Sequence, residues 1–321
     1  MALGRAKERL DDFQQGHAWL GFPFAVVKKF GEDRGGQQAA LVAYYGFFSL
    51  FPLLLAFVTI LGIVLKNNPQ LRDDVLRSAL SQFPIIGEQI GENIGSISTS
   101  GLALAVGLLG ALWAGLAGVK AMQNALDTVW DVPVREQPKK VKLVLRGLAM
   151  LVVLAALTFV ATGLAGTGAE GEALPTWARV FTFPLSLLVN VVVFLLAYKI
   201  LTEADVSWRD VLPGALLAAV AWTALQAVGN YYVANQLRNA TAMYGFFGIV
   251  IGLLSWMFLA AQVTLLCAEV NVVRARRLWP RSLGGGPETE ADRRALELHA
   301  KVEERVPEER VEVGFSDSPP R

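Results

Sequence analysis

The sequence predicts an all-α protein: a polytopic six-helix transmembrane bundle with an amphipathic extracytoplasmic helical hairpin between its first and second helices. Three observations predict this class. Hydrophobic residues make up 54% of the chain and charged residues only 18%, whereas a soluble domain carries about 25% charged residues. The apolar residues form long continuous stretches, without the alternation that barrel strands show. Polar and charged segments separate these stretches.

Six of the apolar stretches are long enough to cross a bilayer. A helix needs about 20 apolar residues to span a hydrocarbon core of about 30 Å. With their short connections, the spans form a predicted membrane domain of residues 39–277. The predicted spans cover about residues 39–65, 101–122, 147–168, 180–201, 211–233 and 244–268.

The basic residues predict the orientation of the bundle. The N-terminal segment, the connection at residues 135–146 and the segment after residue 268 hold most of the lysines and arginines beside the spans. Because lysine and arginine favour the cytoplasmic side of a membrane, we expect both termini in the cytoplasm. An even number of spans agrees with this orientation.

Three segments lie outside the predicted spans. Residues 1–38 lack the pattern of a cleavable signal peptide and are amphipathic; they suit the cytoplasmic membrane surface or, equally, a solvated lead-in to the first span. The connection at residues 66–100 has a helical period broken at Pro84, which predicts two short amphipathic helices on the outer face. Residues 278–321 are rich in Glu and Arg, so we expect a disordered cytoplasmic tail, with a short partner-binding helix near residues 298–306 as the alternative.

Polar side chains within or beside the spans are the functional candidates, because burying them in a membrane is costly. Lys120, Asn124 and Asp127 share one face of the second span, which either lines a polar cavity or lies at the membrane surface. Glu269 is expected to pair with Lys120 or Arg146, either as a static ion pair or as a gate.

The full set of candidates for a cavity or gate combines these groups with tyrosines, prolines, amides and a tryptophan of the spans. It comprises Tyr44, Tyr45, Ser49, Pro52, Lys120, Asn124, Asp127, Pro184, Asn190, Gln226, Asn230, Tyr244, Trp256, Glu269 and Asn271. No catalytic residue, metal site or cofactor is expected. The two histidines, His17 and His299, lie near opposite ends of the chain, which disfavours a histidine-rich metal site.

Four short motifs resemble those of a known family. They are Tyr44-Tyr45 with Ser49-Leu50-Phe51-Pro52, then Leu212-Pro213-Gly214-Ala215, then Tyr244-Gly245 with Ser255-Trp256, and last Ala268-Glu269-Val270-Asn271. This ensemble resembles the YihY/virulence factor BrkB family of bacterial inner-membrane proteins, formerly labelled ribonuclease BN-like. The similarity runs from about Phe24 to Arg277, and Cys267 stands where family members commonly show glycine. The resemblance implies a six-helix protein of the bacterial inner membrane and brings no settled activity.

The expected function is therefore that of a transporter or flippase-like protein for an envelope lipid or small solute. The alternative is a non-transporting membrane scaffold for envelope assembly. A ribonuclease or other hydrolase is disfavoured, because Ser49 and Ser255 have no evident base and no cluster of metal-binding residues is apparent. We expect membrane lipids as partners and no nucleic acid, since the net charge is only +1; a second copy of the chain or envelope proteins remain open as partners.

Overall fold

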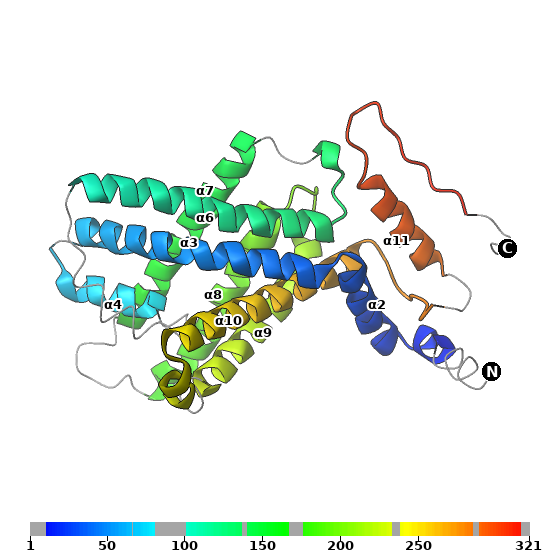
Figure 1. Ribbon diagram of the computed structural model, residues 1–321. Helices are drawn as coiled ribbons and strands as arrows, with labels where there is room; N and C mark the ends of the chain where they lie inside the picture. Colours follow the sequence, from blue (N-terminus) through cyan, green and yellow to red (C-terminus); the bar gives the residue numbers. More distant parts are fainter. Residues whose placement is uncertain are drawn as a thin grey trace.

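The computed structural model describes residues 11–65, 67–80, 101–136, 140–166, 176–232, 238–284 and 289–315. Within these ranges all regular structure is helical, which confirms the all-α part of the prediction. The long helices are α3 (Gly35–Val64), α6 (Gly101–Val129), α7 (Lys140–Gly166), α8 (Thr176–Leu201), α9 (Trp208–Tyr232) and α10 (Arg238–Ala275) (Figure 1). The shorter elements are α2 (Ala18–Glu32), α4 (Pro69–Leu80), the 3-10 turn η2 (Val134–Glu136) and α11 (Glu290–Lys301).

Three helices in the described part of the chain contain stretches that are long and apolar enough to cross a membrane. These stretches are Pro184–Leu201 in α8, Trp208–Gly229 in α9 and Val250–Ala275 in α10. Large apolar side chains also point away from the bundle: Trp113 of α6 is 80% exposed and Phe247 of α10 is 75% exposed. Since soluble proteins rarely expose large apolar areas of this kind, lipid is the natural solvent for these helix faces.

The long helices pack on one another along much of their length. Helix α3 lies against α6, α10 packs on both α3 and α9, and α8 contacts α7 and α9. Small residues permit the closest of these contacts: a Cβ atom added to Gly118 of α6 would lie 2.9 Å from Ser49 Oγ of α3. Pro52 in α3 and Pro184 in α8 both lie inside continuous helices.

A buried apolar core lies where α2, α6, α8 and α10 meet. Its members include Ala25, Leu126, Leu265 and Val272, each no more than 1% exposed. The Tyr198 hydroxyl donates a 2.7 Å hydrogen bond to the Thr264 carbonyl oxygen, which joins α8 to α10. We call this end of the bundle the charged end, because the ionised side chains described below surround its core. Figure 1 shows α2 and α11 at this end and α4 at the other.

One short helix lies in the connection where the sequence predicted an outer hairpin. Helix α4 coincides with the first of the two amphipathic helices expected between residues 66 and 100. Residues 81–100, which contain the second, lie outside the described part of the chain.

The expectation of a disordered tail at residues 278–321 is wrong for residues 278–284 and 289–315. Helix α11 begins with a capping box, in which Thr289 accepts a hydrogen bond from the Asp292 backbone and Asp292 accepts one from the Thr289 backbone. Its residues Ala291 and Ala295 are buried against the rest of the protein. We call residues 289–315 the C-terminal strap. Composition did not predict the C-terminal strap, because polar contacts to other segments stabilise its structure more than apolar burial does.

Candidate functional site

Five ionisable residues converge at the charged end and form what we call the buried charge cluster. Lys29 lies near the end of α2, Asp33 directly follows α2, Asp131 follows α6, and Glu269 and Arg276 lie at the end of α10. The side chains of Lys29, Asp33, Asp131 and Glu269 are each no more than 4% exposed, and that of Arg276 is 26% exposed. The cluster thus joins three segments that are far apart in the sequence.

Lys29 is the centre of the cluster. Its Nζ lies 2.6 Å from Asp33 Oδ2, 3.3 Å from Asp131 Oδ2 and 3.9 Å from Glu269 Oε2. The Asp33 contact is local, because Lys29 and Asp33 are four residues apart, and Asp33 also caps α2 through its backbone N–H. The other two contacts tie α2 to the turn after α6 and to α10.

Arg276 supplies the second cation. Its Nη1 lies 3.2 Å from Asp131 Oδ2, and its Nη2 donates a 2.5 Å hydrogen bond to the Trp130 carbonyl oxygen. The guanidinium also lies 5.9 Å from the centre of the Trp130 ring, at a distance where a cation–π contact stabilises it. From the strap, His299 Nδ1 lies 3.9 Å from Asp131 Oδ1, and its side chain is 60% exposed.

The turns that carry the cluster are strained. Asp131 itself has a φ of 48°, while Arg34 and Arg277, which follow Asp33 and Arg276, have φ of 53° and 54°. Within the described residues these are the non-glycine residues with positive φ. Such a conformation costs an L-residue roughly 1–2 kcal/mol, and strain of this kind concentrates at functional sites and switch regions.

Glu269 is the least satisfied member of the cluster. It is 0% exposed, and neither of its carboxylate oxygens receives a hydrogen bond from a described donor. It shares Lys29 with Asp33, whose Oδ2 lies 2.6 Å from the same Nζ atom. Lys29, at 3.9 Å, is its nearest described cation.

The electrostatic environment shifts the pKa values of the members outside the spans. Burial raises the pKa of Asp33, and the attraction of Lys29 only partly offsets this. Burial acts to lower the pKa of Lys29, but the combined attraction of Glu269, Asp131 and Asp33 outweighs it and raises the value. Burial lowers the pKa of Arg276 despite the nearby Asp131. The Asp33 carboxyl group therefore binds a proton more readily than a free aspartate does, and Lys29 stays charged.

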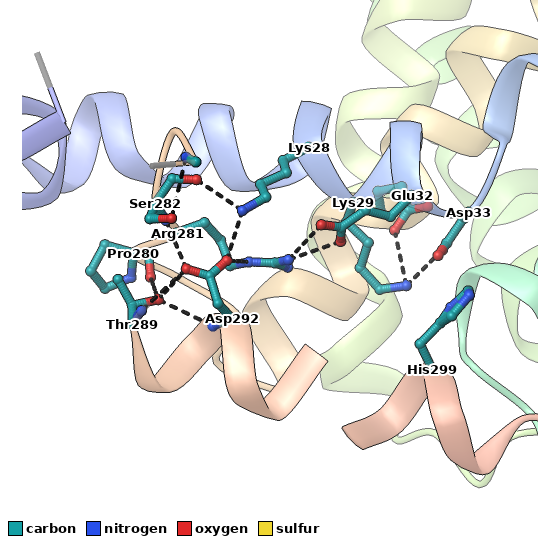
Figure 2. A network of polar contacts seen from close by, with 12 residues as sticks. Lys28, Lys29, Glu32, Asp33, Pro280, Arg281, Ser282, Thr289, Asp292 and His299 are labelled. Atoms are coloured by element: carbon teal, nitrogen blue, oxygen red, sulfur yellow. Dashed lines mark hydrogen bonds and ion pairs between the residues drawn. The ribbon is translucent and has the colours of Figure 1, made fainter. Parts of the chain in front are cut away.

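A second polar network, shown in Figure 2, fastens the strap to α2. Asp292 accepts hydrogen bonds of 2.8 Å from Lys28 Nζ, 2.5 Å from Arg281 Nε and 2.9 Å from the Ser282 backbone. Arg281, whose side chain is 1% exposed, also pairs with Glu32 of α2 at 2.7 Å. We call these contacts the strap lock. Burial acts to raise the pKa of Asp292, but the donors around it hold the value well below its usual range.

A third network surrounds Asp127, beyond the predicted span of residues 101–122. Its Oδ1 accepts a 2.8 Å hydrogen bond from the Glu203 backbone, and the Glu203 carboxylate in turn contacts both Arg146 and Lys142. Burial raises the pKa of Asp127 to about 6, against the lowering effect of the hydrogen bond from Glu203. This network joins the ends of α6, α7 and α8.

The structure separates the residues that the sequence singled out as cavity or gate candidates. Ser49, Asp127, Trp256, Glu269 and Asn271 are buried, whereas Pro52, Asn190 and Gln226 are partly buried. Tyr44, Tyr45, Lys120, Asn124 and Pro184 are exposed. Asn230 and Tyr244 lie in α9 and α10, but their side chains are outside the described part. Only Glu269 belongs to the charge cluster, so the candidate set does not converge on one cavity.

The expected partner of Glu269 is wrong. Lys120 is exposed, and Arg146 pairs with Glu203, while Lys29 is the cation next to Glu269. Of Lys120, Asn124 and Asp127, which were placed on one face of the second span, only Asp127 is buried, so the three side chains do not line one buried cavity.

Sequence reasoning missed Lys29, Asp33, Asp131 and Arg276 altogether. Each lies outside the predicted spans, where a charged side chain is tolerated whether or not it has a partner, so its presence in the sequence was no signal of a site. The structure also brings His299 close to the cluster, although His299 is far from Lys29, Asp33 and Asp131 in the sequence. Asp33, Asp131 and His299 offer ligand atoms within 4.8 Å of one another, a spacing at which a metal ion could bind. Lys29 Nζ, however, already provides a cation beside both carboxylates.

The fold and this site define a helical integral membrane protein with a buried charge cluster at one end of its bundle. More narrowly, the chain belongs to the Virulence factor BrkB family, whose model matches residues 26–292. The resemblance stated from the sequence motifs is thereby confirmed. No solved structure is significantly similar to the chain.

Several relatives support the assignment to a membrane family. The chain is 27% identical to the putative ribonuclease-like protein YfkH of Bacillus subtilis, over 80% of this chain and 96% of that protein. It is 25% identical to the inner membrane protein YhjD of Escherichia coli, over 76% of this chain and 77% of that protein. It is 26% identical to a UPF0761 membrane protein of Alkalilimnicola ehrlichii, over 88% of this chain and 66% of that protein. Two of these names state a membrane location, and the third describes its protein as putative ribonuclease-like.

Proposed function

We propose that this protein is a transporter or flippase-like protein for an envelope lipid or a small solute, and that the buried charge cluster is its gate. In this proposal six helices, α3 and α6 to α10, span the bacterial inner membrane. The charged end faces the cytoplasm, because the basic residues flanking the spans gather there. The relative named an inner membrane protein supports this location.

The observation that carries the proposal is the burial of Lys29 between carboxylates from three segments. Buried ion pairs add little to stability compared with apolar contacts of the same size, because both charges lose their hydration. The strained turns at Arg34, Asp131 and Arg277 add a further cost. An arrangement that costs this much suits contacts that must break and re-form during function.

The geometry indicates which parts would separate when the gate opens. Lys29 and Asp33 are local to α2 and its following turn, so they would move together. Glu269 belongs to α10, and Arg276 directly follows the last residue of this helix. Opening would therefore part α2 from the end of α10, and water entering the gap would hydrate the released charges. A substrate could then reach the bundle from the cytoplasmic side.

The test is a flux assay with the full chain reconstituted in liposomes. Scrambling of a fluorescent phospholipid and release of trapped small solutes would be measured separately. We expect Lys29→Gln and Glu269→Gln to change the flux at least tenfold, because each breaks the ion contact between α2 and α10. The matched control is Lys120→Gln, which removes an exposed lysine of α6 and should leave flux unchanged.

The same assay decides against the proposal if the wild-type protein moves neither lipid nor solute above protein-free liposomes. That result would favour the alternative of a non-transporting membrane scaffold. Unchanged flux in both cluster variants would instead remove the cluster from the gate.

We further propose that the activity is not enzymatic. Ser49, one of the two serines considered as a nucleophile, donates its hydroxyl hydrogen bond to the Gly46 carbonyl oxygen of its own helix at 2.8 Å. This bond occupies the hydroxyl proton that a catalytic base would have to remove. Hydrolysis of RNA by the purified protein, abolished by one substitution in the charge cluster, would contradict this proposal.

A further inference from the structure

Inside the buried charge cluster, the carboxyl groups of Asp33 and Glu269 both face Lys29, whose Nζ lies 2.6 Å from Asp33 Oδ2 and 3.9 Å from Glu269 Oε2. Two ionised carboxylates cannot hydrogen-bond to one another, because each oxygen is only an acceptor. Glu269 is 0% exposed and receives no hydrogen bond from a described donor. Its carboxyl group therefore lacks the donors that a buried carboxylate normally has.

The charges around this pair do not balance. Helix α2 contributes Lys29, the turns after α6 and α10 contribute Asp131 and Arg276, and the strap contributes His299. His299 is mostly exposed and faces Asp131 rather than Glu269. With all three carboxyl groups ionised, the buried part of the cluster would carry three negative and two positive charges. An uncompensated charge in such a place costs several kcal/mol, so it attracts a proton or a cation.

We propose that Asp33 and Glu269 share one proton, and that this pair is the proton-binding site of the transport proposed above. The proton makes one carboxyl group a donor to the other, and it reduces the charges of the cluster to two of each sign. On release, the O–H bond breaks and the proton passes to water. The pair is then doubly negative, and its repulsion pushes the turn after α2 away from α10. This inference rests on the proposed function for its role in transport, whereas the shared proton stands on the geometry alone.

A proton fits this site better than a metal ion does. Lys29 Nζ already lies within 3.9 Å of carboxylate oxygens of Asp33, Asp131 and Glu269. A divalent ion bound between the same oxygens would have to displace this ammonium group or bear its repulsion. A proton needs no such space, because it binds directly to one carboxylate oxygen and can be shared with the other carboxyl group. The raised pKa of Asp33, which follows from its burial, agrees with this assignment.

The experiment is infrared spectroscopy of the purified full-length protein in lipid nanodiscs at neutral pH. We expect a C=O stretching band from a protonated carboxyl group, shifted by exchange into ²H₂O. Glu269→Gln and Asp33→Asn should each abolish the band, because either change leaves two carboxylates to match two cations. The matched control is Glu290→Gln, since the Glu290 side chain is 94% exposed and should not contribute.

Two results would overturn the shared proton: a wild-type protein without the band at neutral pH, or a band that survives both cluster substitutions. Stoichiometric metal that co-purifies with the wild type and is lost in Glu269→Gln would overturn it as well. If one variant fails to fold, the other variant and the isotope shift of the wild type still decide. If the protein shows the band but no flux, the proton pair is supported and transport is rejected. If it shows flux but no band, transport is supported and the proton pair is rejected.

Discussion

The Asn271 side chain on α10 accepts a 2.6 Å hydrogen bond through Oδ1 from the backbone N–H of Gly214 on α9. Both residues belong to the short motifs on which the family resemblance rested. Asn271 is 0% exposed, so this bond fixes two spans at close range in a site that water does not reach. It gives glycine and asparagine a structural role at these two positions.

Gly214→Ala is expected to destabilise the protein by about 1–3 kcal/mol, as overpacking of a close contact does. An added Cβ atom would lie 2.2 Å from the Cys267 carbonyl oxygen and 2.5 Å from Asn271 Nδ2. Thermal unfolding in detergent measures the effect. Gly110→Ala is the control, because no atom lies within 4 Å of the added Cβ; equal melting temperatures for the two variants would refute the packing account.

Lys29→Gln is expected to lower the free energy of unfolding far more than the double variant Lys29→Gln/Glu269→Gln does. Lys29→Gln leaves three buried carboxyl groups with only Arg276, and breaking a buried pair in this way costs about 3–5 kcal/mol. The double variant Lys29→Gln/Glu269→Gln should recover a large part of this loss. A double-mutant cycle of unfolding free energies measures the coupling. Additive effects of the two substitutions would mean that Lys29 and Glu269 do not interact.

The raised pKa of Asp127 predicts that the stability of the protein depends on pH. Its pKa is raised to about 6 by burial, so the folded protein binds this proton more tightly than the unfolded chain does. The contribution of Asp127 is therefore most favourable below about pH 4 and is lost as the pH rises to about 6, by roughly 1–3 kcal/mol. Asp127→Asn should flatten this part of the stability curve in detergent. A curve that keeps its slope in the variant would assign the dependence to another group.

Asp292→Ala is expected to release the strap. The substitution leaves Lys28 without its carboxylate partner and the buried Arg281 with Glu32 alone, and it removes the capping box of α11. Amide hydrogen exchange at residues 290–301 should speed up by at least a factor of ten, while exchange in α6 stays the same. Glu290→Ala, at an exposed position of the same helix turn, is the control. Equal protection in both variants would contradict the role of the strap lock.

The strap lock also has a pH dependence of opposite sign. The pKa of Asp292 is held below its usual range, so its stabilising contribution is present above the pKa of an unfolded aspartate, about 4. It is lost as the pH falls through the lower pKa of the folded protein. Hydrogen exchange of α11 at decreasing pH, corrected for the intrinsic exchange rate, tests this; constant protection in acid would be inconsistent with it.

The sequence predicted the helical membrane class because that class depends on local composition. Runs of apolar residues place α8, α9 and α10 without any knowledge of their neighbours. The strap was missed because its order depends on contacts between Asp292 and Lys28, 264 residues away. A local signal was still present, since Thr289 and Asp292 have the spacing of a capping box.

The charge cluster could not be predicted in the same way. Glu269 stands out because it ends a long apolar run, but its partner lies on α2, and nothing in a single sequence distinguishes Lys29 from Lys28. The structure shows that the difference is orientation: Lys29 is buried toward α10, whereas Lys28 points to the strap. Pairing between helix ends is a property of the packed bundle, so it lies beyond composition and periodicity.

The most direct test of the gate is the distance between α2 and the end of α10 in a lipid bilayer. Spin labels at the exposed positions Trp19 and Ala275, in a Cys267→Ala background, report this distance by double electron–electron resonance. We predict two distance populations. Their ratio changes with pH in the labelled protein that retains Glu269, and it stays constant when Glu269→Gln is added. A single distance that is the same at every pH would contradict the gate.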